Sequence, residues 1–111
     1  MLPDMYQRRA MNKLKKVNIL GKIYTIEYVK ELHEVDINGR EQCFGQIDYV
    51  TKSIRVYDRD RANDDIVEVL LHEIIHGICS EMLIQIEEKD VNTLGIVLAD
   101  TLIRNKIIDV K

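Results

Sequence analysis

Hydrophobic and polar residues alternate in the first half of the chain and recur at helical spacing in the second half. In the stretch KVNILGKIYTIEYV, residues 16–29, one side carries Ile23, Thr25 and Glu27, and the other carries Tyr24, Ile26 and Tyr28. A period of two is typical of a β-strand with one buried face. The pattern therefore predicts a β-hairpin that turns near Leu20-Gly21.

A second pair of strands is expected in CFGQIDYV, residues 43–50, and KSIRVYD, residues 52–58. Ile54 and Val56 fall on one face of the latter, and the polar link Thr51-Lys52 suits a hairpin. The dipeptide Asn38-Gly39 is a strong turn signal, so the chain is expected to turn back between the two pairs.

After Tyr57 the period changes from two to 3.6, which predicts two helices. The first is expected to begin among acids and amides that favour a helix N-terminus, and to end near Leu83. The second runs from about Glu87 to Asn105, with its apolar residues at helical spacing: Val91, Leu94, Val97, Leu98 and Leu102. Two helices after a small sheet predict an α+β domain over residues 13–111. Residues 1–12 lack this periodicity and are interpreted as a flexible arm.

The first predicted helix is divided into an apolar and a polar side. Its apolar sector, expected to pack on the sheet, contains Val67, Leu70, Leu71, Ile74, Ile75, Ile78 and Met82. His72 and His76 lie opposite, together with Asp65, Glu68 and Cys79. The helix can therefore bury one side while the histidines face a cleft.

The segment HEIIH, residues 72–76, predicts a zinc site on that polar side. Side chains four apart on a helix are neighbours, so both imidazoles can reach one ion. Glu73 is offset from the metal axis, where it can take a proton from water as a general base. His33 is also followed by glutamate, but Ile37 replaces the second histidine, and we interpret His33 as a loop or strand residue.

The third zinc ligand has three candidates. Cys79 lies on the histidine side, but three ligands from under three turns of one straight helix can hardly converge on one ion. Glu87 and Glu88, at the start of the second helix, are better placed. The residues that share a helix face with Glu87 are bulky and are expected in the core. Those that share a face with Glu88 are smaller or polar and leave room for the metal. Helical geometry thus favours Glu88 and keeps Glu87 as the alternative.

Composition narrows the functional classes. The chain has 111 residues, a net charge of −3, 46% hydrophobic and 32% charged residues, which fits one globular domain and no nucleic-acid partner. Two cysteines and the lack of a charged-then-apolar signal sequence favour a reducing cytoplasm. Charges interrupt every apolar run before it reaches membrane-spanning length, so no membrane association is expected.

HEIIH followed by a helix that reads E-x-x-V-x-x-L-G, Glu88 to Gly95, resembles the gluzincin branch of zinc metallopeptidases. It is most similar to the small phage and mobile-element proteins of the ImmA/IrrE kind, over roughly residues 17–105. The resemblance implies a zincin-like fold with a mainly antiparallel sheet, zinc held by His72, His76 and Glu88, and Glu73 as general base. No His or Tyr follows the second helix to stabilise an oxyanion, which leaves Tyr49 and Tyr57 as candidates.

These observations predict a phage-encoded, cytoplasmic zinc metallopeptidase that hydrolyses a peptide or protein substrate. An edge strand near Ile54 is expected to hold the substrate by β-addition. The alternative is a zinc-stabilised binding module that acts on a host or phage regulatory protein and has little or no turnover. Nothing in the sequence indicates the oligomeric state.

Overall fold

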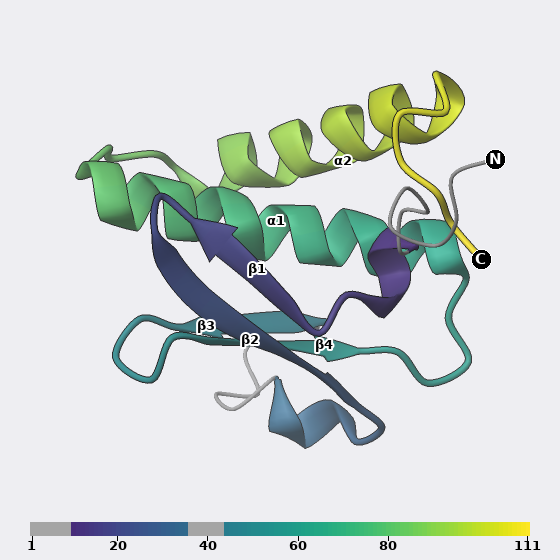
Figure 1. The fold of residues 1–111 in the computed structure, drawn as a ribbon, viewed down its shortest axis with the longest axis horizontal. Coiled ribbons are helices and arrows are strands. Elements are labelled where there is room, and N and C mark those ends of the chain that lie inside the picture. Colours follow the sequence, from purple (N-terminus) through teal and green to yellow (C-terminus); the bar gives the residue numbers. More distant parts are fainter. Residues whose placement is uncertain (1–9, 36–43) are drawn as a thin grey trace, which may run out of the picture.

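The protein is a β-sheet covered on one face by a helix, with a second helix packed on the first (Figure 1). The computed structural model describes residues 10–35 and 44–111. Its elements are the 3₁₀ helices η2 (Met11–Lys13) and η3 (Leu32–Glu34), the strands β1 (Lys16–Ile19), β2 (Lys22–Val29), β3 (Gly45–Asp48) and β4 (Ser53–Tyr57), and the helices α1 (Asn63–Met82) and α2 (Glu88–Arg104). The predicted α+β class and both predicted helices are confirmed.

The sheet is mixed, with the strand order β1-β2-β4-β3. β1 pairs with β2 and β3 with β4 in antiparallel fashion, whereas β2 and β4 pair in parallel at the centre. The expected edge strand near Ile54 is wrong, because Ile54 lies in β4 between two neighbours. The strand at this edge is β3, the first strand of the second hairpin.

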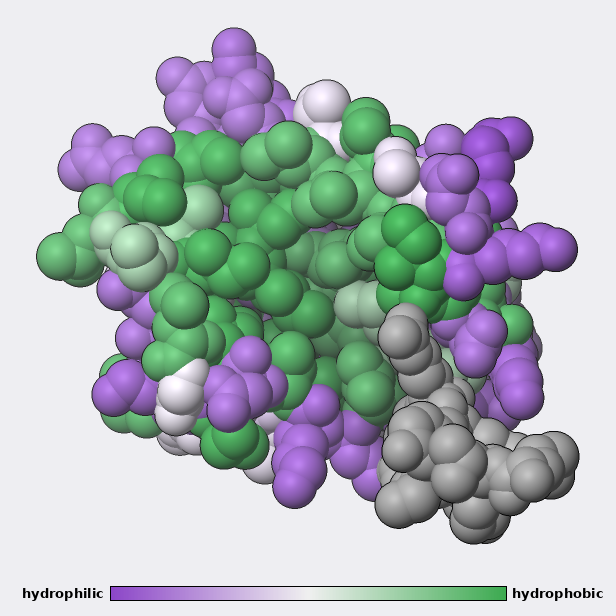
Figure 2. Space-filling model, turned by 45° about the horizontal axis from the view of Figure 1, so that its top comes forward, coloured by the Kyte–Doolittle hydropathy of each residue, from purple (hydrophilic) through white to green (hydrophobic). Residues whose placement is uncertain are grey.

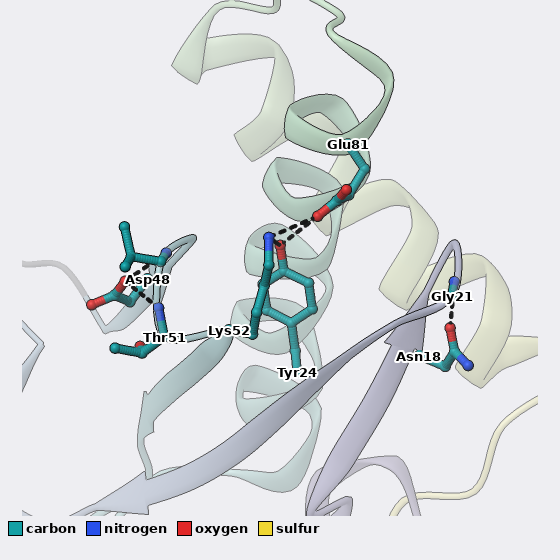
Figure 3. A network of polar contacts seen from close by, with 8 residues as sticks. Asn18, Gly21, Tyr24, Asp48, Thr51, Lys52 and Glu81 are labelled. Carbon is teal, nitrogen blue, oxygen red and sulfur yellow. Dashed lines mark hydrogen bonds and ion pairs between the residues drawn. The ribbon is translucent and has the colours of Figure 1, made fainter.

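Local hydrogen bonds fix the two hairpin turns, as Figure 3 shows. Leu20 (φ 52°) and Gly21 (φ 88°) both adopt left-handed conformations, and the Asn18 side chain accepts a 2.7 Å hydrogen bond from the Gly21 N–H. In the second hairpin the Asp48 carboxylate accepts backbone hydrogen bonds of 2.9 and 3.0 Å from Val50 and Thr51. Both predicted hairpins are confirmed, while the predicted turn at Asn38-Gly39 lies outside the described residues.

The apolar side of α1 is shared between two cores. Ile66 and Leu70 pack with the sheet residues Tyr24, Ile54 and Val56, all of them buried. Val67 and Leu71 instead pack with Ala99 of α2. The prediction that the whole apolar sector of α1 packs on the sheet is therefore corrected, since α2 takes part of it.

The outer surface of the helices is unusually apolar. Figure 2 turns this side of the molecule forward and shows hydrophobic side chains over most of it. Ile78 and Met82, expected in the core, are 40% and 56% exposed, and the stripe expected to be buried along α2, with Leu94, Val97 and Leu98, is 39–54% exposed. The reason is that α2 packs through its small residues Gly95 and Ala99, which turns these larger side chains outward.

The two ends of the described chain meet beside α1. Ala10 and Asn12 are buried, and the Met11 N–H donates to the Asp109 carbonyl at 3.0 Å. The Asn12 amide donates to the Lys111 carbonyl at 2.7 Å and accepts from the Lys111 N–H at 3.1 Å. The packed part of the chain thus begins by Ala10, inside the segment 1–12 that was interpreted as an arm.

Candidate metal site

One unbroken stretch of α1 carries both histidines of HEIIH on the same side. His72 and His76 are half-buried, with ring centroids 5.0 Å apart and ring planes at 59°. This arrangement follows from the helix itself, because positions i and i+4 are one turn apart.

The start of α2 brings a carboxylate to both imidazoles. One oxygen of Glu88 lies 2.6 Å from Nε2 of His72, and the other lies 2.8 Å from Nε2 of His76. Glu87 precedes the helix, and its carboxylate lies 3.5 Å from the Lys89 ammonium. In the described part of the chain, the group of potential metal ligands consists of His72, His76 and Glu88 and does not include Cys79.

α2 contacts α1 beside His72 through Gly95. A Cβ on Gly95 would already lie 3.5 Å from backbone and side-chain atoms of His72, so α2 crosses α1 in van der Waals contact beside the histidine. Val91, one turn before Gly95, is fully buried. These two residues fix α2 on α1, and Glu88 extends from its first turn to the histidines.

The donor set suits zinc. The ligand atoms of His72, His76 and Glu88 lie within 4.8 Å of one another. Bonds of about 2.0–2.1 Å in a tetrahedral arrangement separate ligand atoms by roughly 3.3 Å, and two imidazoles with one carboxylate leave a fourth position for water or substrate. Small side-chain rotations would convert the present hydrogen-bonded spacing into that spacing, so the residues fit the ion.

Glu73 is a buried carboxyl group beside this cluster. Only 7% of its surface is exposed, and burial together with the negative charge of Glu88 raises its pKa to about 8. Its Oε2 lies 4.0 Å from Nε2 of His72. A Cβ on Gly45 would lie 2.6 Å from Cγ1 of Val69 and 3.0 Å from Oε2 of Glu73, so the glycine is what permits β3 to lie against this carboxyl.

These groups open into a cleft of about 670 Å³ between the start of β3 and the two helices. Its lining includes Asn92, which the sequence placed on the same face of the second helix as Glu88, and residues that the sequence did not single out: Phe44, Gly45, Arg61, Val69, Lys89 and Ile96. Arg61 precedes α1 and its extended N-cap residue Ala62, so the helical spacing of the histidines does not extend to it and no local pattern singles it out. Phe44 and Gly45 enter through long-range strand pairing, which no local pattern reveals.

The other candidate residues, Tyr49, Tyr57 and His33, differ in how they relate to the site. Partial burial, and then the negative charge of Glu73, raise the pKa of Tyr49, so this phenol lies in the electrostatic field of the site. Tyr57 instead stacks on Phe44 with ring centroids 6.2 Å apart. His33 lies exposed in η3 and is not part of the ligand group.

Comparison of the chain with protein-family models, with curated proteins and with solved structures gives no match. Across residues 10–35 and 44–111, neither helix combines the length and the apolar character needed to cross a membrane.

Proposed function

We propose that this protein is a zinc-dependent metallopeptidase with a zincin-like arrangement of its site. One observation carries the proposal. His72, His76 and Glu88 converge within 4.8 Å, beside a buried glutamate from the same helix and in an open cleft. This combination supplies three protein ligands, a base and room for a substrate, which are the parts that metal-assisted hydrolysis needs.

In this proposal the ligands and the base have separate tasks. Zinc held by His72, His76 and Glu88 would supply a Lewis acid that polarises a peptide carbonyl and acidifies water. Glu73 accepts the proton of the water whose oxygen adds to the carbonyl carbon, and then passes this proton to the amine nitrogen as the C–N bond breaks. A pKa raised to about 8 by burial and by Glu88 suits a group that must both take up and release a proton near neutral pH.

The free edge of β3 is the proposed binding surface for the substrate backbone. β3 is the last strand of the sheet, and Gly45 at its start lines the cleft. An extended peptide can add to such an edge as one more strand, which places its carbonyl groups along the cleft. Tyr49, in the turn after β3, is the candidate to stabilise the oxyanion, since partial burial and then the charge of Glu73 raise its pKa.

The test combines elemental analysis with a peptide-library assay. Protein never exposed to chelator is expected to carry about one zinc per chain, and Glu73→Gln is expected to keep the zinc and lose hydrolysis. Glu87→Gln, an exposed neighbour of the site, is the matched control and retains both.

Two results would contradict this function. Protein without zinc would end the metal assignment, and equal hydrolysis by the parent and Glu73→Gln would remove Glu73 from the mechanism. A zinc-loaded parent that cleaves no peptide in the library would favour the alternative, a zinc-stabilised binding module.

A further inference from the structure

We propose that Arg61 recognises a carboxylate in the cleft, and that the peptide substrate carries this carboxylate on the C-terminal side of the scissile bond. The inference rests on the proposed metallopeptidase function and adds a substrate class to it. Three features of Arg61 support it: the contact of its guanidinium with the Phe44 ring, its lack of a carboxylate partner among the described residues, and its place in the lining of the cleft.

A stack of aromatic rings holds the Arg61 guanidinium in place. Its central carbon lies 3.9 Å from the centroid of the Phe44 ring, and the Phe44 ring in turn stacks on Tyr57. The Tyr57 N–H donates a 2.8 Å hydrogen bond to the Phe44 carbonyl, which ties the stack to the edge of the sheet. The guanidinium is therefore positioned before any ligand arrives.

Arg61 differs from the other arginines that the structure describes in having no carboxylate partner among the described residues. Arg55, Arg59 and Arg104 each form an ion pair with a glutamate or an aspartate. Nη1 of Arg61 is buried, yet within the described part of the chain it has no hydrogen-bond partner. A buried donor without a partner is costly, and a carboxylate is the group that best matches the planar fork of a guanidinium.

Strand direction determines which side of the substrate meets Arg61. A peptide added antiparallel to β3 runs from the Asp48 end toward the Gly45 end, where Phe44 and Arg61 line the cleft. Its residues after the scissile bond therefore point toward Arg61. The carboxylate is either the C-terminus of the substrate or an Asp or Glu side chain in this part of it.

Paired hydroxamate probes can test this recognition without a known substrate. Each probe is a dipeptide with a zinc-binding hydroxamate at its N-terminal end. The first pair ends in a free carboxylate or in a carboxamide, and the second pair is amidated and carries a Glu or a Gln side chain. Zinc-loaded parent is expected to bind the carboxylate member of at least one pair about tenfold to a hundredfold more tightly, and the responding pair identifies the source of the carboxylate.

The preference is expected to disappear in Arg61→Gln and to survive only weakly in Arg61→Lys, which keeps the charge but loses the fork. Arg59→Gln, an exposed arginine paired with Glu31, is the matched control and keeps the preference. Zinc content and thermal unfolding are measured for every variant, so that a misfolded protein is recognised.

The outcomes separate this inference from the function on which it rests. Equal binding of acid and amide by zinc-loaded parent, or an unchanged preference in folded Arg61→Gln, overturns the role of Arg61 and leaves the metallopeptidase proposal standing. Failure of the parent to bind zinc or any hydroxamate overturns both.

The exposed apolar surface of the helices carries a second, independent inference. We infer that a second copy of this chain covers the apolar face formed by Ile78, Met82, Leu83, Ile84, Leu94, Val97 and Leu98. Each of these side chains is 39–90% exposed, and the hydrophobic area over the helices is broad (Figure 2). Seven exposed apolar side chains on two packed helices exceed the scattered single apolar residues of an ordinary surface, and a standard interface takes about 800 Å² from each partner.

A second copy is the occupant that this face fits best, because none of its seven residues is charged and a two-fold interface must be complementary to itself. Light scattering after size-exclusion chromatography is expected to give twice the chain mass for the parent and a monomer for Leu98→Glu. Thr51→Glu, in an exposed turn of the sheet, places the same charge elsewhere and is expected to stay dimeric. A parent that remains monomeric at high micromolar concentration, or a dimeric Leu98→Glu, overturns the inference and leaves the face to another kind of partner.

Discussion

Two groups of polar side chains lie along α1, and they differ in how their charges are balanced. Toward its C-terminal end, Glu81 accepts 3.0 Å hydrogen bonds from the Tyr24 hydroxyl and from the Lys52 ammonium (Figure 3). Here an anion meets a cation, and hydrogen bonds from Lys52 and Tyr24 lower the pKa of Glu81. The group joins β2, the second hairpin and α1, and its charges balance one another without a bound ion.

The group around His72, His76 and Glu88 has no such balance. In the described chain neither Glu73 nor Glu88 forms an ion pair with a lysine or arginine, and the pKa of Glu73 is raised where that of Glu81 is lowered. Two glutamates on one helix thus have opposite pKa shifts, because Glu73 is buried beside the charge of Glu88 whereas Glu81 accepts hydrogen bonds from Lys52 and Tyr24. A charge-balanced group stabilises the fold, whereas a group with excess negative charge and imidazole nitrogens is suited to binding a cation.

Adding zinc is expected to produce the largest change in stability, and to act only through the group of His72, His76 and Glu88. At free zinc about 1,000 times the dissociation constant, the parent gains about 4 kcal/mol of stability, because the ion binds only the folded site. His72→Ala and His76→Ala lose this gain, and His33→Ala, an exposed histidine outside the group, keeps it. Thermal unfolding with zinc and with chelator measures the difference, and an identical zinc response in His72→Ala would show that His72 does not bind the ion.

The adjacent acids at the start of α2 are expected to differ in their effect on zinc affinity. Glu88→Ala is expected to weaken zinc binding at least about 100-fold, since it removes a direct ligand and even supporting residues are worth about 10–100-fold. Glu87→Ala changes the affinity little, because its carboxylate faces Lys89. Competition with a chromogenic chelator gives both affinities, and the reverse order would transfer the role to Glu87.

The glycines beside the site are expected to differ in their tolerance of a methyl group. Gly45→Ala costs about 1–3 kcal/mol of stability, because the new Cβ would lie 2.6 Å from Val69 and 3.0 Å from the Glu73 carboxyl. Gly95→Ala meets His72 only at 3.5 Å and, as a helix-interior substitution, is neutral or stabilises by up to about 1 kcal/mol. Denaturant unfolding ranks the two variants, and equal stabilities would show that β3 can shift to accommodate the methyl group at little cost in free energy.

The balanced group gives the smallest expected effect. Tyr24→Phe removes one hydrogen bond to Glu81 and costs about 1 kcal/mol. Because folding lowers the pKa of Glu81, its ionised form contributes stability above its unfolded value near 4.5, and this contribution is lost as the pH falls through the folded pKa. Glu81→Gln is therefore less stable than the parent at pH 7 and converges with it in acid. A stability difference that persists in acid would show that charge is not the cause.

The hydrophobic period predicted most of the secondary structure, because strand and helix patterns depend on residues close in sequence. It located both hairpins and both helices. It did not predict the parallel pairing of β2 with β4, which joins strands on either side of the segment 36–43. It also assigned Leu94, Val97 and Leu98 to the core, since a periodic apolar stripe does not say whether a partner covers it.

The sequence by itself placed His72 and His76 one helical turn apart with Glu73 between them, because the spacing of a helix is a local property of the backbone. Only the tertiary structure brought Glu88 to the two imidazoles, through the contact of Gly95 with α1, and set β3 against Glu73 through Gly45. It also decided which residues line the cleft, including Arg61. These features depend on how elements far apart in the chain pack, and packing is determined by the shape and volume of all contacting side chains at once.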